Sequence, residues 1–145
     1  MTELALLVES TVMSLSLSWQ ERSIRIDVTS PWGDKKRISI IATGITECRV
    51  EDVRLYNIID RVTIFDAEES QKRASECASL LFFLLNNREP TSSDLESPLL
   101  RERRALIQRN ELTLLAIDAV CGATFLVLAE NVVIQPTAGC PTSRF

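Results

Sequence analysis

The stretch from Asn57 to Asn87 constrains the fold most strongly, because a strand pattern runs directly into a helix pattern. Residues 58–66 are rich in Val, Ile, Thr and Phe, which favour a pleated strand, and they carry apolar side chains on both faces. Asp66 suits a helix N-cap, and Glu69 follows three residues later, where a capping box has an acid. We therefore predict an interior strand followed at once by a helix.

The predicted helix becomes apolar on nearly every side in its second half, where residues 80–85 read LLFFLL. A bilayer span needs about 20 apolar residues, so this much shorter run indicates a core helix, with contact to a second subunit as the alternative. Asn86 and Asn87 can end the helix, because Asn tolerates the left-handed conformation of a C-cap.

Strand patterns also precede this stretch. Met13, Leu15, Leu17 and Trp19 alternate with serines and a glutamine, which is typical of a strand with one serine-lined face. Further strands are predicted over residues 23–29 and 38–43, with a bulge or bend at Gly44 before a continuation over 45–53. Together with residues 58–65 they would form an antiparallel meander of four strands. Residues 3–9 fit a short helix or an edge strand, and the helix is favoured.

The second half of the chain predicts another helix and a hairpin. After a polar linker, Ser97 and Pro98 suit the N-cap and first position of a shorter helix. Residues 111–134 return to strand patterns, with Gly122 in the turn of a hairpin. The predicted fold class is α+β: a four-strand N-terminal meander plus a C-terminal hairpin, packed on one face by one long apolar helix and a second shorter helix. Residues 1–134 would form a single domain and 135–145 a C-terminal tail.

Composition narrows the chemistry. The chain has 145 residues, a net charge of −4 and no histidine, which argues against nucleic-acid binding by a basic surface and excludes triads built on histidine. Four cysteines, at 48, 77, 121 and 140, form no CxxC pair, so we expect no metal centre and no cofactor. The N-terminus lacks a basic n-region, which predicts a cytoplasmic protein with reduced thiols.

Two kinds of side chain are candidates for catalysis. Asp27, Asp66 and Asp118 each follow an apolar strand pattern, so they would either cluster at one end of the sheet or serve as turn and cap residues, which is the favoured interpretation. Cys48 and Cys121 are interpreted as buried small residues rather than reactive thiols, and Cys140 is expected to be exposed. No catalytic residue is therefore assigned, and we expect a protein that is not an enzyme.

Two features suggest binding. The arginines of the second helix, Arg101, Arg103, Arg104 and Arg109, would recognise an anion or an acidic partner, or would form a solvated face paired with Glu102 and Glu111. Trp32, in a turn between Pro31 and Gly33, would anchor a partner or fold back over the sheet.

The order of strands, helix, helix and hairpin, with GIxxC at residues 44–48 and NII at 57–59, resembles small bacterial domains that include immunity-type proteins. An immunity-like role, in which the chain masks a basic partner, would fit this resemblance and the net charge of −4. We expect a non-enzymatic protein-binding or structural domain, a homodimer that makes contact through a sheet edge or open face and binds neither nucleic acid nor membrane. The alternative is a small-ligand-binding domain or a minor enzyme that uses a carboxylate cluster or a thiol.

Overall fold

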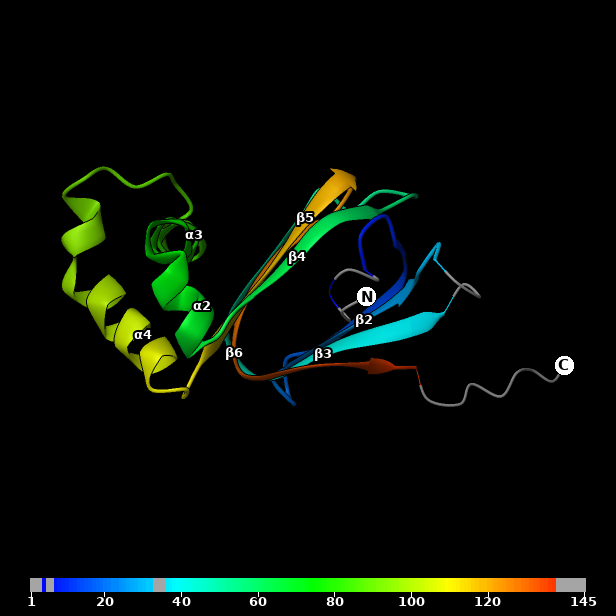
Figure 1. The fold of residues 1–145 in the computed structure, drawn as a ribbon, viewed down its shortest axis with the longest axis horizontal. Coiled ribbons are helices and arrows are strands. Elements are labelled where there is room, and N and C mark those ends of the chain that lie inside the picture. Colours follow the sequence, from blue (N-terminus) through cyan, green and yellow to red (C-terminus); the bar gives the residue numbers. More distant parts are fainter. Residues whose placement is uncertain (1–3, 5–6, 33–35, 138–145) are drawn as a thin grey trace, which may run out of the picture.

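Six antiparallel strands form a barrel, and the helices lie together on one side of it (Figure 1). The computed structural model describes residues 4, 7–32 and 36–137. The strands are β1 (Thr11–Ser18), β2 (Ser23–Thr29), β3 (Arg37–Glu51), β4 (Ile58–Phe65), β5 (Thr113–Cys121) and β6 (Thr124–Pro136). Their order around the barrel is β1-β2-β3-β6-β5-β4, so the mixed fold class predicted from the sequence is confirmed.

The four-strand meander was wrong in its last step, because β3 and β4 are not neighbours. The hairpin of β5 and β6 lies between them, with β6 paired to β3 along most of its length and β5 paired to β4. The cause is the apolar character of both faces of these strands, which a sheet with one wet face would leave exposed. Closing the sheet buries one face inside the barrel, and the helices cover part of the other.

The two faces of β5 belong to two separate hydrophobic cores. Leu115 and Ile117 point into the barrel, where they pack with side chains from the other strands. Leu114 and Ala116 point outward and pack beneath the helices. The barrel interior is therefore the larger core, and the helix layer forms a second core on its outer surface.

Two irregularities shape the barrel wall. Gly44 has a φ of +66°, and the register of β3 against β6 shifts between Ile45 and Glu47, which confirms the predicted bend. In β4 the register shifts on both sides of Ile59, so Ile59 and Val62 both belong to the interior core although they are three residues apart. The alternation of inward and outward side chains is therefore interrupted within β4.

The predicted long helix consists of two pieces, α2 (Ala67–Lys72) and α3 (Ala74–Asn86), which meet at Arg73. Asp66 caps α2 by accepting a hydrogen bond from the Glu69 amide at 2.8 Å, and Asn87 ends α3 in the left-handed conformation, as predicted. Arg73 departs from helical dihedrals with φ −122° and ψ 50°, while its guanidinium lies over the Phe65 ring at 5.3 Å. The apolar segment of α3 is buried in the helix-side core, as predicted.

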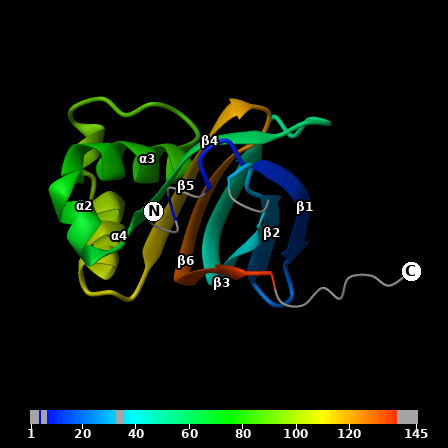
Figure 2. The ribbon, with the colours of Figure 1, turned by 45° about the vertical axis from the view of Figure 1, so that its right-hand side comes forward.

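A short turn, η1 (Asp94–Glu96), and the helix α4 (Pro98–Gln108) complete the helix layer. Ser97 caps α4 by accepting a hydrogen bond from the Leu100 amide, so the predicted start of this helix is confirmed. Figure 2 shows the helices on one side of the barrel and β1 on the opposite side.

The ends of the described chain both contact the barrel. Leu7 is fully buried in the interior core, and residues 7–9 form a turn. Of the segment 3–9, only Leu4 and residues 7–9 are described, and Leu4 packs half-buried against the same core. At the other end, β6 continues to Pro136, two residues into the segment predicted as a tail.

Candidate binding surface

The barrel is closed only narrowly between β1 and β4. Thr11 pairs with Ile58, and the Val12 amide donates to the Asn57 carbonyl at 2.8 Å. Beyond that point, within the part of the chain that the structure describes, no strand pairs with the outer edge of β1. We refer to this edge, from Met13 to Ser18, as the β1 edge.

Apolar side chains on the β1 edge remain exposed although they face the same side of the sheet as core residues. Leu15 lies opposite Ile26, and Leu17 lies opposite Ile24, both of which are buried in the interior core. Leu15 and Leu17 nevertheless expose 38% of their surface, and Trp19 in the following turn exposes 75%. The interior of the barrel is therefore incompletely covered along β1.

Two hollows flank these leucines. One, of about 240 Å³, extends from Val12–Leu15 past Val53 and Leu55 to Phe125 at the start of β6. The other, of about 320 Å³, lies between Leu17 and Trp19 on one side and the stretch 45–48 of β3 on the other. The β1 edge therefore separates two shallow depressions, each with apolar walls.

The loop from Asp52 to Asn57 forms the far wall of the first hollow. Asn57 holds the loop in place, because its side-chain oxygen accepts from the Arg54 amide at 2.9 Å and the Ala123 amide at 2.8 Å, while its nitrogen donates to the Arg54 carbonyl at 2.7 Å. The loop presents apolar side chains to solvent, since Leu55 is 88% exposed and Tyr56 is 69% exposed. Apolar surface thus borders the β1 edge on both sides of the hollow.

The β1 edge also lacks the devices that usually protect an unpaired strand. Natural edge strands carry Lys or Pro, or turn a charge inward, because exposed backbone groups otherwise pair with other chains. Residues 11–20 contain no charged residue and no proline. A register shift between Val12 and Ser14 disturbs only the beginning of the edge.

Trp32, one of the residues predicted to bind a partner, folds back onto the protein. Its indole nitrogen donates to the Val8 carbonyl at 2.9 Å, and 40% of its surface remains exposed. This contact holds the described part of the turn after β2 against the N-terminal segment. Gly33, which the same prediction involved, lies outside the described residues.

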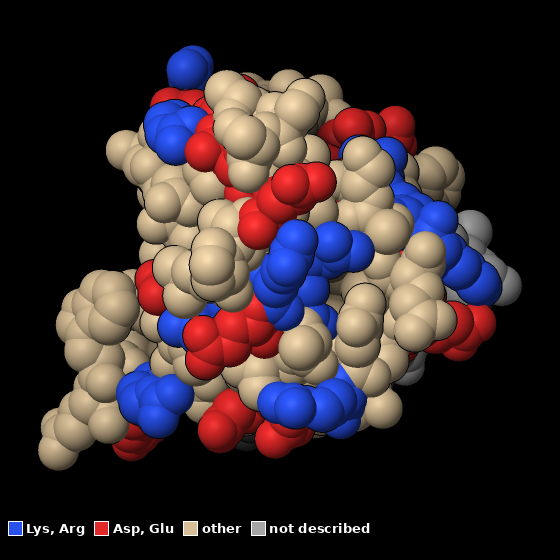
Figure 3. All heavy atoms as spheres, turned by 90° about the vertical axis from the view of Figure 1, so that its left-hand side faces the viewer, with Lys and Arg blue, Asp and Glu red and all other residues tan. Residues whose placement is uncertain are grey.

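The predicted arginine group lies on α4, on the side of the molecule that bears the helices. Figure 3 shows basic and acidic side chains interspersed on this side. Arg109 pairs with Glu111 at 2.7 Å and Arg103 with Glu102 at 3.7 Å, which are the two glutamates expected for a solvated helix face. Arg101 forms no ion pair with the residues that the structure describes. Arg101 and Arg109 are exposed, as a solvated face requires, whereas Arg103 and Arg104 are half-buried and the buried Nε of Arg103 has no hydrogen-bond partner among the described residues.

The three aspartates do not gather around a common centre; each has its own partners. Asp66 caps α2, and Asp118 pairs with Arg61 at 3.2 Å across β4 and β5. Asp27 on β2 accepts hydrogen bonds from Ser39 at 2.6 Å, Ser14 at 3.0 Å and Arg25 at 3.0 Å. Among the described residues, no group of three or more acids or cysteines could hold a metal ion.

Neither Cys48 nor Cys77 is an activated thiol. Burial raises the pKa of Cys48 above its ordinary value, and burial raises the pKa of Cys77 to about 11. Cys121, predicted to be buried, is instead exposed at the end of β5, where its sulfur lies 3.8 Å from the Tyr56 carbonyl. Cys121 is the last residue of β5, four positions past Ile117, the last residue of this strand in the interior core, which explains the error. Cys140 lies outside the described residues.

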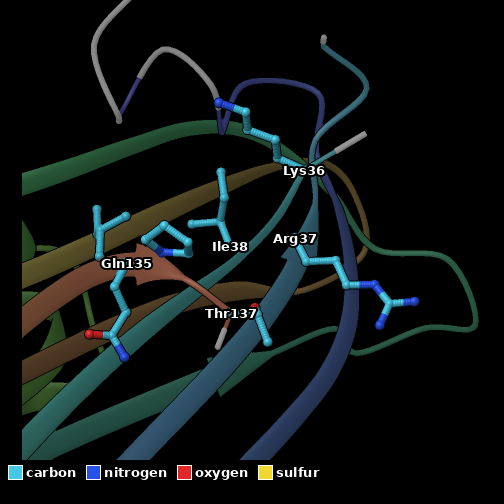
Figure 4. Close-up of a pocket in the computed structure, with 7 residues that line it drawn as sticks. Lys36, Arg37, Ile38, Gln135 and Thr137 are labelled. Carbon is cyan, nitrogen blue, oxygen red and sulfur yellow. The ribbon is translucent and has the colours of Figure 1, made fainter. Parts of the chain in front are cut away.

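A larger hollow, of about 420 Å³, lies between the start of β3 and the end of β6. Figure 4 shows that the cationic ends of Lys36 and Arg37 point in different directions, while Gln135 lies on the opposite side. Because its charged groups do not converge, this hollow has no arrangement that selects a ligand.

Sequence reasoning located β1 but interpreted its apolar face as covered. The signal that identifies the exposed edge is the absence of charge from residues 11–20, together with the apolar pair Leu55–Tyr56 in a turn. None of the helices in the described chain has the length and apolar character needed to cross a bilayer. No protein-family model, curated protein or solved structure matches the chain.

Proposed function

We propose that the protein is a non-catalytic binding module that recognises another polypeptide through the β1 edge. The observation that carries this proposal is the unpaired, uncharged edge of β1, with Leu15, Leu17 and Trp19 exposed along it. An extended segment placed there adds a strand to the sheet, gains backbone hydrogen bonds and covers the apolar side chains. Binding through a sheet edge also agrees with the expectation from the sequence.

The arrangement of the acids and thiols supports binding over catalysis. A carboxylate cluster would have favoured a small enzyme, but Asp27, Asp66 and Asp118 lie apart and are engaged by neighbours. In the lining of the first hollow, the Asn57 amide is occupied by backbone partners and the Ser14 hydroxyl donates to Asp27. Arg54 is the one polar side chain there that makes no side-chain hydrogen bond or ion pair with the described residues, so no set of polar groups converges on a small ligand.

The chemistry of the β1 edge also indicates what kind of partner it suits. The net charge of −4 would fit the masking of a basic partner, as an immunity-type role requires. The edge itself is uncharged, so the contact depends on backbone pairing and apolar burial. We therefore propose a partner segment in which apolar and small polar residues alternate.

The test uses short fluorescent peptides in which valine and serine alternate, compared with peptides of the same composition in scrambled order. The alternating peptide should bind better, and Leu17→Lys should weaken its binding at least about tenfold, because a charge enters an apolar contact. Leu99→Lys, at an exposed leucine on α4, is the matched control and should leave binding unchanged. A protein that neither binds the peptide nor associates with itself would contradict the proposal.

A further inference from the structure

We infer that the partner of the β1 edge is a second copy of this chain, which pairs β1 with β1 in antiparallel fashion about a twofold axis at Ser16. This inference rests on the proposed function and names its partner. A twofold interface brings the same patch of both copies together, so the patch must complement itself. The β1 edge meets this condition in charge, pattern and length.

The charge condition is met because no residue between Thr11 and Gln20 is charged, so two copies of β1 approach without repulsion. The pattern condition is met because leucines alternate with serines. An antiparallel pair centred on Ser16 places Leu15 opposite Leu17 and Ser14 opposite Ser18 of the second copy. Apolar side chains directly opposite one another are the unit that stabilises paired strands.

Length selects Ser16 as the centre. Pairing with Ile58 occupies β1 at Thr11, and the strand ends in the turn at Trp19. Met13 begins the β1 edge and Trp19 directly follows its last residue, and the midpoint between Met13 and Trp19 is Ser16. Any other centre shortens the overlap between the two copies.

This register gives the most exposed side chain of the edge a place to dock. Trp19 of one copy lies opposite Met13 of the other, and Met13 lines the hollow of about 240 Å³ that also contains Leu55. The indole is 75% exposed in the single chain. In the dimer, the Trp19 indole of each copy would cover the hollow of the other copy. Aromatic side chains in such pockets dominate the energy of many interfaces.

The surroundings of the hollow add a complementary charge. Arg54 lines the hollow and makes no ion pair with the described residues. Glu21 stands two residues after Trp19 and is exposed. Docking of Trp19 from the second copy brings its Glu21 to the side where Arg54 lies.

The experiment measures mass by sedimentation equilibrium over about 1 to 100 µM, a range that resolves micromolar association. The wild type should approach twice the chain mass of 16.3 kDa. Leu15→Lys and Leu17→Glu should each weaken association at least about tenfold, because each variant places two charges against leucines. Circular dichroism should show both variants folded, since Leu15 and Leu17 are partly exposed in the single chain.

Mixing the two variants tests the register. With Ser16 at the centre, the lysine introduced by Leu15→Lys in one chain faces the glutamate introduced by Leu17→Glu in the other, while the second pair remains leucine against leucine. The mixture should therefore recover association to within about tenfold of the wild type. A centre at Leu15 would place the new lysine opposite leucine and the new glutamate opposite methionine, without recovery. Leu99→Lys again serves as the control and should leave association unchanged.

Each contrary outcome has a distinct meaning. A wild type that remains monomeric to about 100 µM overturns the dimer, whereas the peptide titration still decides whether the β1 edge binds polypeptides. A dimer that persists in both variants overturns the β1 contact itself. Loss of association in the variants without recovery on mixing overturns the register centred on Ser16.

Discussion

The side of the barrel under the helices and the side at β1 carry the same kinds of apolar side chain, but these side chains are buried on the first side and partly exposed on the second. Leu81 of α3 is fully buried beneath the helix layer, whereas Leu17 of β1 leaves 38% of its surface in solvent. The helix side is reinforced at its margins, where Arg49 lies over Phe83 at 4.7 Å and Arg88 over Phe82 at 4.9 Å. The difference indicates that stability is concentrated under the helices and that β1 is available for contact with another chain.

The sharpest way to test this difference is to make the same truncation on both sides. Leu81→Ala should lower the free energy of unfolding by about 2–5 kcal/mol, because it leaves a cavity in a packed core. Leu17→Ala should lower it by about 1 kcal/mol or less, since the side chain is already partly in water. Urea unfolding at a concentration where the chain is monomeric measures both values, and equal losses would contradict the distinction.

A smaller effect is expected at the turn between β5 and β6, which packs against the loop at residues 52–57. A Cβ added at Gly122 would lie 2.3 Å from the Asn57 side-chain oxygen and 2.7 Å from the Tyr56 carbonyl, and its φ is +90°. Gly122→Ala should therefore cost about 1–3 kcal/mol, as expected for backbone strain of this kind. It should also move the loop at residues 52–57 and weaken peptide binding at the β1 edge. Unchanged thermal unfolding would contradict this account of the turn.

The smallest effect concerns Asp27, on the outer face of the β1 side. Burial acts to raise the pKa of Asp27, but hydrogen bonds from Ser39, Arg25 and Ser14 outweigh burial, so the pKa lies below its ordinary value of 3.8. A carboxyl group with a lowered pKa stabilises the fold above its unfolded pKa and loses that contribution as the pH falls through its folded pKa.

Asp27→Asn should therefore be less stable than the wild type at pH 7 by less than about 1 kcal/mol, a size typical of partly exposed ion pairs. The difference should shrink as the pH falls below 3.8. Urea unfolding at a series of pH values measures it, and a difference that stays constant across the series would refute the role given to the carboxylate.

The sequence allowed the strands, the helix caps at Asp66 and Ser97 and the bend at Gly44 to be predicted, because each depends on residues close together in the chain. The strand order was not predictable in this way, since it depends on whether β3 meets β4 or β6, and both choices satisfy the local patterns. The break at Arg73 between α2 and α3 was likewise not predicted, because the helix pattern of the sequence runs through this position without interruption.

The candidate site was likewise predictable in part from the sequence. The alternation of Met13, Leu15, Leu17 and Trp19 identifies a strand. The same alternation occurs whether the apolar face of the strand is covered by other parts of the protein or exposed to solvent. The narrow contact between Thr11 and Ile58, together with the exposure of Leu15 and Leu17, reveals that the apolar face of β1 is uncovered. Trp32 was preferred to Trp19 because it stands in a loop, yet the structure ties Trp32 to the Val8 carbonyl.

The position of β6 has a consequence for folding of the chain. β6 joins β3 to β5, and it is the last of the described strands in the sequence. Until residues 124–136 take their place, β3 and β5 lack the neighbour that they share. A folding intermediate without β6 therefore exposes the edges of both strands, and such species are prone to aggregate.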